Sequence, residues 1–234
     1  MKTTILFFLV VISVSVVAQE HKSDDLILQF THGIGVSLQK FGGLNDRIAK
    51  FPQYKKLPDY TGTLELGMLK EHRRLLSDMN LMIGSSLSDH NKKGSVIRFF
   101  GINIGVGYDL LTDKNILLYP LAGLGFEGFQ ARFYRDNSSV PFDSLLQSPS
   151  AQNSLHSLDF TNYFFNYRLG FGFSLKSDKH PFASIGLQAV YTGSFNSRAW
   201  KSNQNQSLKD APEDKLSQYH IALIFGRQTN FMKH

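Results

Sequence analysis

The sequence predicts an all-β protein, an eight-stranded antiparallel up-and-down transmembrane β-barrel, and three observations support this prediction. Eight stretches alternate apolar residues with small or polar ones, as strands with one oily and one polar face do. The gaps between these stretches are alternately long and short. The polar face is mostly Gly, Ser, Thr, Asn and Gln, which suits a narrow lumen better than the water-facing side of a soluble secreted barrel.

The first 18 residues are expected to be a signal peptide, and residues 19–234 the barrel domain. Lys2 is followed by an apolar run, and Val16-Val17-Ala18 forms a small-residue site that predicts cleavage before Gln19. The apolar run is shorter than the roughly 20 residues of a spanning helix. The chain contains no Cys, which excludes a disulfide scaffold and thiolate chemistry.

The first four strands follow from the alternation and from the polar segments between them. A gap of about twenty residues separates the first two, whereas a short turn at Arg73 joins the second to the third. The fourth is the clearest, because Ile102 and Ile104 fall on one face and Gly101 and Asn103 on the other. The predicted ranges are 25–39, 60–71, 75–87 and 96–110.

The last four strands repeat the pattern. The turn-forming Asp113 and its neighbours lead into the fifth strand, where Pro120 is a poor fit because it cannot donate a ladder hydrogen bond. The longest gap follows, and a short turn around Asp178 connects the sixth strand to the seventh. The predicted ranges are 116–127, 162–175, 183–195 and 219–231.

The gap lengths predict how the barrel sits in a bacterial outer membrane. Outer-membrane barrels have long extracellular loops and short periplasmic turns. The long gaps at 40–59, 88–95, 131–158 and 196–215 are therefore expected outside the cell, and the turns around Arg73, Asp113 and Asp178 in the periplasm. Every strand exceeds the roughly 9 to 11 residues that a tilted strand needs to cross the bilayer.

The oily face is predicted to contact lipid. Ile102, Ile104, Leu169, Phe171 and Leu223 lie on it. Aromatic residues gather near the strand ends of the same face, where they are candidates for the interface girdles of a membrane barrel. The candidates are Tyr60, Phe126, Tyr163, Phe165, Phe195 and Tyr219 towards the outside, and Tyr108 and Phe173 towards the periplasm.

The signal peptide, the alternation, the gap pattern and the closing segment from Ile224 to Phe231 together resemble the small outer-membrane β-barrel family of Bacteroidetes, the PorT-like group. The closing segment, with Gly226 and Phe231, looks like the signal read by the barrel-assembly machinery. The resemblance implies that machinery as a partner during biogenesis. Outer-membrane lipid and lipopolysaccharide are the other expected partners, and no nucleic acid is expected for an exported chain.

Five polar residues on the strands are predicted to line the lumen. Glu65 and Arg168 are expected to meet as a buried ion pair, because strands two and six lie across the lumen and a lone buried charge is costly. Glu127 is a nearer-surface alternative partner for Arg168. His32 and His220 are expected to be hydrogen-bonded lumen histidines on adjoining strands, without the third ligand that a metal site would need.

No catalytic residue, metal or cofactor is predicted. Residues 123–128 match a dinucleotide fingerprint, but that motif requires a following helix, which the pattern does not predict. The His-x-Ser triplet of lipid A deacylases occurs only at His21-Lys22-Ser23, before the first strand. We expect a non-enzymatic protein with a surface-binding, membrane-anchoring or assembly role. The alternatives are a narrow transport barrel for a small apolar ligand and a lipid A-modifying enzyme.

Overall fold

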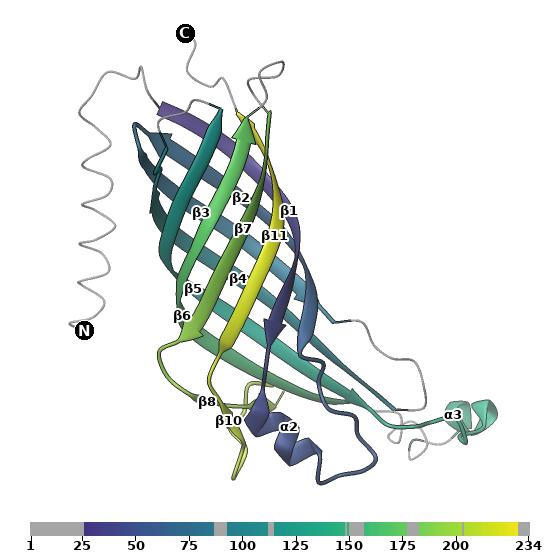
Figure 1. Cartoon of the computed structure of the whole chain (residues 1–234). Helices are drawn as coiled ribbons and strands as arrows, with labels where there is room; N and C mark the ends of the chain where they lie inside the picture. The colour runs from purple at the N-terminus through teal and green to yellow at the C-terminus, as the bar shows by residue number, and fades with distance from the viewer. Residues whose placement is uncertain are drawn as a thin grey trace.

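The computed structural model describes residues 26–86, 93–111, 115–147, 149, 157–176, 183–202 and 204–228. The predicted signal peptide and the end of the closing segment, from Thr229 to Phe231, lie outside these residues. Eight long strands form the barrel (Figure 1). They are β1 (Leu26–Gln39), β2 (Tyr60–His72), β3 (Leu75–Ser85), β4 (Gly94–Tyr108), β5 (Ile116–Tyr134), β6 (Leu158–Lys176), β7 (Ala183–Ser194) and β11 (Ser217–Gln228).

The strands close into a complete antiparallel barrel. Each pairs with the next along the chain, and β11 pairs with both β7 and β1. Closure leaves no sheet edge unpaired, which is the condition for strands to cross a membrane. The predicted eight-stranded antiparallel barrel is confirmed.

The described parts of the long connections lie at one end of the barrel, called here the loop end, which is the lower end in Figure 1. They contain two short helices, α2 (Gly42–Ile48) and α3 (Phe142–Gln147), and three two-residue strands, β8 (Arg198–Ala199), β9 (Lys201–Ser202) and β10 (Glu213–Asp214). The short turn at Arg73, between β2 and β3, lies at the opposite end, called here the turn end, whereas the predicted turns around Asp113 and Asp178 lie outside the described residues. No helix in the described part of the chain is both long and apolar enough to cross a bilayer.

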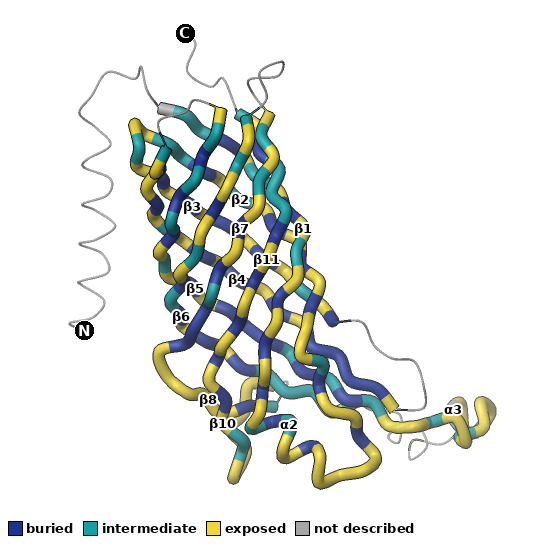
Figure 2. Tube along the Cα trace, in the orientation of Figure 1, coloured by how far each residue is buried: buried dark blue, intermediate teal, exposed yellow. Residues whose placement is uncertain are grey.

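Burial alternates along the strands, as the sequence pattern predicts (Figure 2). Ile102 and Ile104 are about half exposed, as are Leu169 and Phe171, whereas Asn103, between the two isoleucines, and Arg168, next to Leu169, are buried. The aromatic side chains near the loop end also lie on the outer surface and contact one another, for example Phe126 with Tyr163 and Tyr191 with Tyr219. The exposed apolar band is the surface that lipid would cover.

The two longest strands continue further than predicted. β5 and β6 pair as far as Phe133 and Leu158, so the predicted 131–158 gap is partly strand. The alternation continues because Ala131 and Phe133 face a buried cluster at the loop end. Arg132, on the outer side, forms an ion pair with Asp159 across the same extension.

Pro120 is accommodated inside β5. It pairs with Phe171 on β6, whereas the ladder with β4 ends one residue away, at Leu121 and Gly107. The missing N–H therefore falls at an interruption of the β4 ladder, beyond which the Leu110 N–H donates to the Leu118 carbonyl at 2.8 Å.

Inner-face glycines make room for bulky neighbours. Gly172 lies opposite Tyr119, and a Cβ atom at Gly172 would overlap the tyrosine ring. A Cβ atom at Gly105 would likewise lie 3.0 Å from Leu121 Cδ1. The repeated glycines thus belong to the packing of a narrow lumen. The segment 123–128 lies within β5, where strand rather than helix follows it.

Candidate functional site

The lumen consists of three layers, which can be followed along the inner face of β5. At the turn end, Leu117, Tyr119 and Leu121 belong to a small apolar cluster. At the loop end, Phe129 and Phe133 belong to a larger cluster rich in aromatic residues. Between them lies a polar layer that includes Glu127. Apolar side chains therefore close the lumen on both sides of its polar middle.

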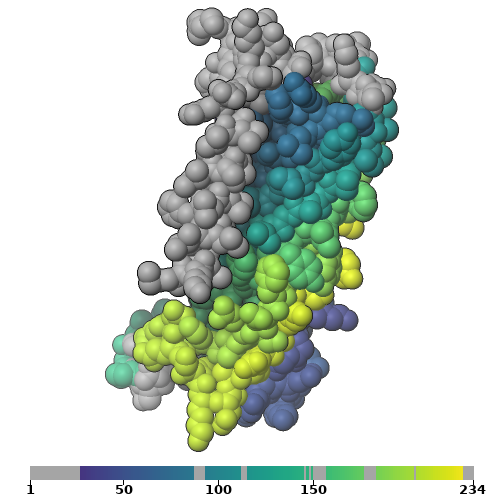
Figure 3. Space-filling view, turned by 90° about the vertical axis from the view of Figure 1, so that its left-hand side faces the viewer, coloured from purple at the N-terminus to yellow at the C-terminus, as the bar shows by residue number. Residues whose placement is uncertain are grey.

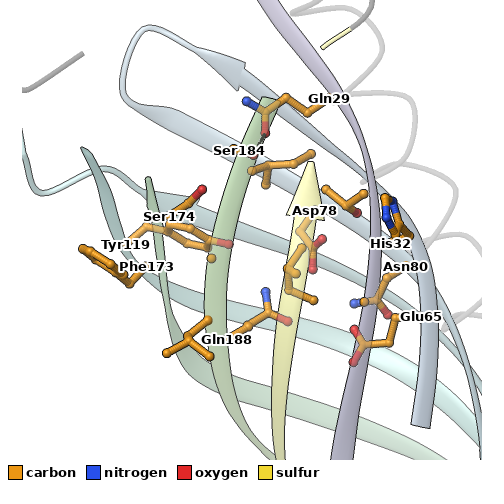
Figure 4. Close-up of a pocket in the computed structure, with 16 residues that line it drawn as sticks. Gln29, His32, Glu65, Asp78, Asn80, Tyr119, Phe173, Ser174, Ser184 and Gln188 are labelled. Carbon is orange, nitrogen blue, oxygen red and sulfur yellow. Dashed lines mark hydrogen bonds between the residues drawn. The ribbon is translucent and has the colours of Figure 1, made fainter. Parts of the chain in front are cut away.

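Two charged contacts organise the polar layer. The Arg168 Nη1 atom lies 3.7 Å from Asp78 Oδ2, and both side chains are buried. The Glu65 carboxylate accepts a hydrogen bond from His220 Nε2, and His220 Nδ1 lies 2.8 Å from the Ser37 hydroxyl. Because a carboxylate can only accept, Nε2 is the donor and Nδ1 can accept the hydroxyl hydrogen of Ser37. Figure 4 shows Glu65, Asp78 and Asn80 grouped on one side of this layer, with Tyr119 and Gln188 facing them.

The prediction that Glu65 and Arg168 form an ion pair is wrong, because each residue has a different partner. Arg168 pairs with Asp78 of β3, and Glu65 pairs with His220 of β11. Barrel strands tilt and their registers are staggered, so two residues in the middle of opposite strands need not lie at the same height. The sequence pattern shows which face a residue occupies but not this stagger.

Glu127 is not near the surface, in contrast to the prediction, but fully buried. Neither of its carboxylate oxygens has a hydrogen-bond partner in the described part of the chain. Asn166 and Gln218 are also buried, and their amide atoms are unpartnered among the same residues. A cavity of about 30 Å³ beside Glu65 and Asp78 is large enough for a single water molecule.

Of the two predicted lumen histidines, only His220 lies in the lumen. His32 is exposed on the outer face, where its ring stacks on Phe225 at 5.5 Å between centroids. The error has a simple cause: His32 has the same parity as Leu28 and Phe30, whose side chains face outwards, and not that of Thr31 and Gly33. The two histidines therefore lie on opposite sides of the barrel wall.

Ser37, His220 and Glu65 have the residue types of a hydrolase triad, which the sequence analysis missed because β1, β2 and β11 bring them together only in the closed barrel. Their exposed fractions are 0%, 3% and 5%. A nucleophilic hydroxyl must reach a substrate carbonyl, and Ser37 is enclosed within the lumen. The geometry therefore supports a structural role for the hydrogen-bonded row of Ser37, His220 and Glu65.

The connections at the loop end are tied together around the carboxylate of Asp214 in β10. Asp214 accepts hydrogen bonds from the backbone N–H groups of Gly43 and Leu44, at 2.7 and 3.0 Å, and from the Trp200 indole at 2.7 Å. These three donors come from the first and last long connections. The carboxylate thus fixes α2 against the 195–216 segment, and Figure 3 shows these two parts of the chain beside each other at this end.

A pocket of about 310 Å³ lies among these connections. Leu44 and Ile48 of α2, Phe160 of β6 and Trp200 form part of its wall, and Arg47 and Arg135 are its charged lining residues. From the sequence, 40–59 was predicted only as a long extracellular gap between two strands. The available signal was the spacing of Leu44 and Ile48, which puts both on one face of a helix.

The apolar outer face, the packed lumen and the connections gathered at one end are those of the small outer-membrane β-barrels. No protein-family model and no curated protein matches the chain. The attachment invasion locus protein Ail of Yersinia pestis is similar in structure, with a TM-score of 0.50 and 14% identity over 88% of this chain and 100% of Ail. OprG of Pseudomonas aeruginosa aligns with a TM-score of 0.47 and 13% identity, over 90% of this chain and 98% of OprG. At 14% identity, the likeness to Ail shows the fold alone.

Proposed function

We propose that the chain is a non-enzymatic protein of the bacterial outer membrane that uses its barrel as an anchor and its loop end as a binding surface. The observation that supports this most is the contrast between a lumen closed by apolar clusters and a loop end with a pocket. Function in barrels of this size is commonly carried by connections on a rigid scaffold.

The alternatives fit the described residues less well. A transport barrel needs a continuous path, but the cavity beside Glu65 and Asp78 in the polar layer holds about one water molecule. A lipid-modifying enzyme needs a nucleophile or base that lipid can reach, and the Ser37, His220 and Glu65 row is buried. Closure of the lumen therefore favours binding over both transport and catalysis.

The same proposal covers the export, the family, the assembly and the lipopolysaccharide contacts of the protein. Export through a cleaved signal peptide, membership of the PorT-like group of Bacteroidetes, assembly by the barrel-assembly machinery and contact with lipopolysaccharide follow from the sequence pattern given above. A chain with an apolar outer band requires an assembly pathway that delivers it to lipid.

Electrical recording of the refolded protein in a planar lipid bilayer tests whether the barrel is closed. We expect no stable single-channel current from the unmodified chain. A water-filled porin reconstituted in the same bilayer is the positive control for current. Steady channels in the unmodified protein would support the transport alternative instead.

A further inference from the structure

The loop-end pocket combines an apolar wall with positive charge. Ile48, Phe160, Trp200 and Leu208 contribute apolar surface. Arg47 and Arg135 line the same pocket, and its lining includes no acidic residue. An apolar cavity with a few charged groups is the usual composition of a site for an amphipathic small molecule.

Both arginines are held in place by neutral acceptors. Arg135 Nε donates to the Tyr54 hydroxyl at 2.7 Å, and its guanidinium lies 5.3 Å from the centroid of the Tyr54 ring. Arg47 Nη2 donates to the backbone carbonyl of Asp210 at 3.0 Å. Neither guanidinium forms an ion pair with an acidic side chain in the described part of the chain. Their charge is therefore fixed in position but not neutralised.

We infer that this pocket binds a single-chain amphipathic anion, with its apolar chain against Ile48 and Phe160 and its carboxylate at Arg47 and Arg135. Arginine is well suited to this role because its N–H groups match a carboxylate in pairs. The volume of about 310 Å³ is at the low end of small-ligand pockets, so it fits one chain rather than a lipid with several. The inference rests on the proposed function, because it assigns a ligand class to the proposed binding end.

Trp200 provides a direct reporter, because it is the only tryptophan of the chain and lies in the pocket wall. A bromine atom quenches indole fluorescence only at close contact. The protein is refolded into phosphatidylcholine nanodiscs and titrated with a fatty acid that carries bromine at the end of its chain. The same acid without bromine and the corresponding bromo-alcohol are the matched ligands. We expect saturable quenching by the brominated acid, relieved by competition with the plain acid, and weaker binding of the alcohol.

The charge requirement is tested by Arg47→Gln and Arg135→Gln together. Because a hydrogen bond to a charged group contributes about 1.5 to 3 kcal/mol, the double variant should bind the acid about tenfold more weakly or worse. Its binding of the alcohol should not change. Arg198→Gln is the control, since Arg198 is an exposed loop-end arginine that does not line the pocket. Heat-dependent gel mobility verifies that each variant is folded.

Two results would overturn the inference. Equal binding of acid and alcohol, unaffected by the arginine changes, would show a purely apolar pocket. Quenching that never saturates, and that a brominated phospholipid reproduces, would show partition into the nanodisc rather than binding. The closed lumen is judged separately by the bilayer recording, so failure of the ligand assignment can be distinguished from failure of the proposed function.

Discussion

The loop end of the lumen and its polar middle are built by the same strands, yet they are held together by different forces. At the loop end, the ring of Phe129 packs against those of Phe41 and Phe99, at 5.0 and 5.2 Å between centroids. Glu127, two residues earlier on the same face of β5, has neither carboxylate oxygen hydrogen-bonded among the described residues. The loop-end cluster is stabilised by the packing of its buried rings, so the loss of one ring should be costly. The polar layer in the middle of the lumen is stabilised by a few charge pairs, whose partners must lie at the same level along the barrel axis.

The largest effect is expected in the loop-end cluster. Phe129→Ala removes a side chain that is 1% exposed and leaves a cavity, so it should cost about 3 to 5 kcal/mol of unfolding free energy. Urea unfolding of the refolded barrel, followed by gel mobility, measures the loss. Phe165→Ala, on the lipid-facing side, is the matched control and should cost less. Equal losses would mean that the cluster does not close the lumen as described.

In the polar layer, the unfolding free energy should depend on the charges of the side chains more than on their volumes. Arg168→Met leaves Asp78 as a buried unpaired carboxylate and should cost about 3 kcal/mol. Adding Asp78→Asn should restore part of that loss, because the two side chains interact directly. When Arg168→Met is combined with Glu65→Gln instead, the two losses of unfolding free energy should be closer to additive. A stronger coupling of Arg168 to Glu65 than to Asp78 would contradict the observed pairing.

The outer face provides a third test that leaves both lumen layers intact. Leu169→Arg places a charge on the lipid-facing side of β6, next to Arg168, which faces inwards. An arginine at the bilayer midplane costs about 2 to 4 kcal/mol. Leu169→Met, which keeps the surface apolar, should be nearly neutral in the same unfolding assay. If both variants unfold alike, Leu169 does not face lipid.

The smallest effect on the whole barrel is expected from Asp214→Asn. The amide retains one acceptor for the three donors Gly43, Leu44 and Trp200, so the loss is about one hydrogen bond, roughly 1 kcal/mol. The loss should remain local. Hydrogen exchange should show faster exchange in α2, with the strands unchanged. Faster exchange throughout β5 and β6 would show that the connections and the barrel unfold together.

Most of the barrel could be predicted from the sequence, because strand faces follow a period of two, and burial keeps this period over most of each strand apart from short buried runs in β4, β5 and β7. The rule gives the wrong face when a residue is assigned to the wrong alternate set of strand positions, as happened for His32. It also does not predict how far along the barrel axis a residue lies. The partners of Glu65 and Arg168 depend on strand tilt and stagger, which emerge only when all eight strands close.

The loop end was the least predictable part. The segment 40–59 was predicted only as a long gap. The contacts that fix it come from residues far along the chain, above all from Asp214, which accepts hydrogen bonds from Gly43 and Leu44, and from Trp200, whose ring contacts Phe41. Such long-range contacts leave little local pattern. The pocket they create, with Arg47 and Arg135 in its lining, could be recognised only in the folded chain.

The central claim is that the folded loop end is the outward-facing, binding end of a closed barrel. The natural chain has no cysteine, so single cysteines can be placed at Lys209, on the loop end, and at His72, on the turn end. Intact cells are treated with a bulky maleimide that cannot cross the outer membrane. We predict labelling of Lys209→Cys in intact cells, and of His72→Cys only after the membrane is permeabilised. Labelling of His72→Cys alone in intact cells would contradict the account, because the pocket would then face the periplasm.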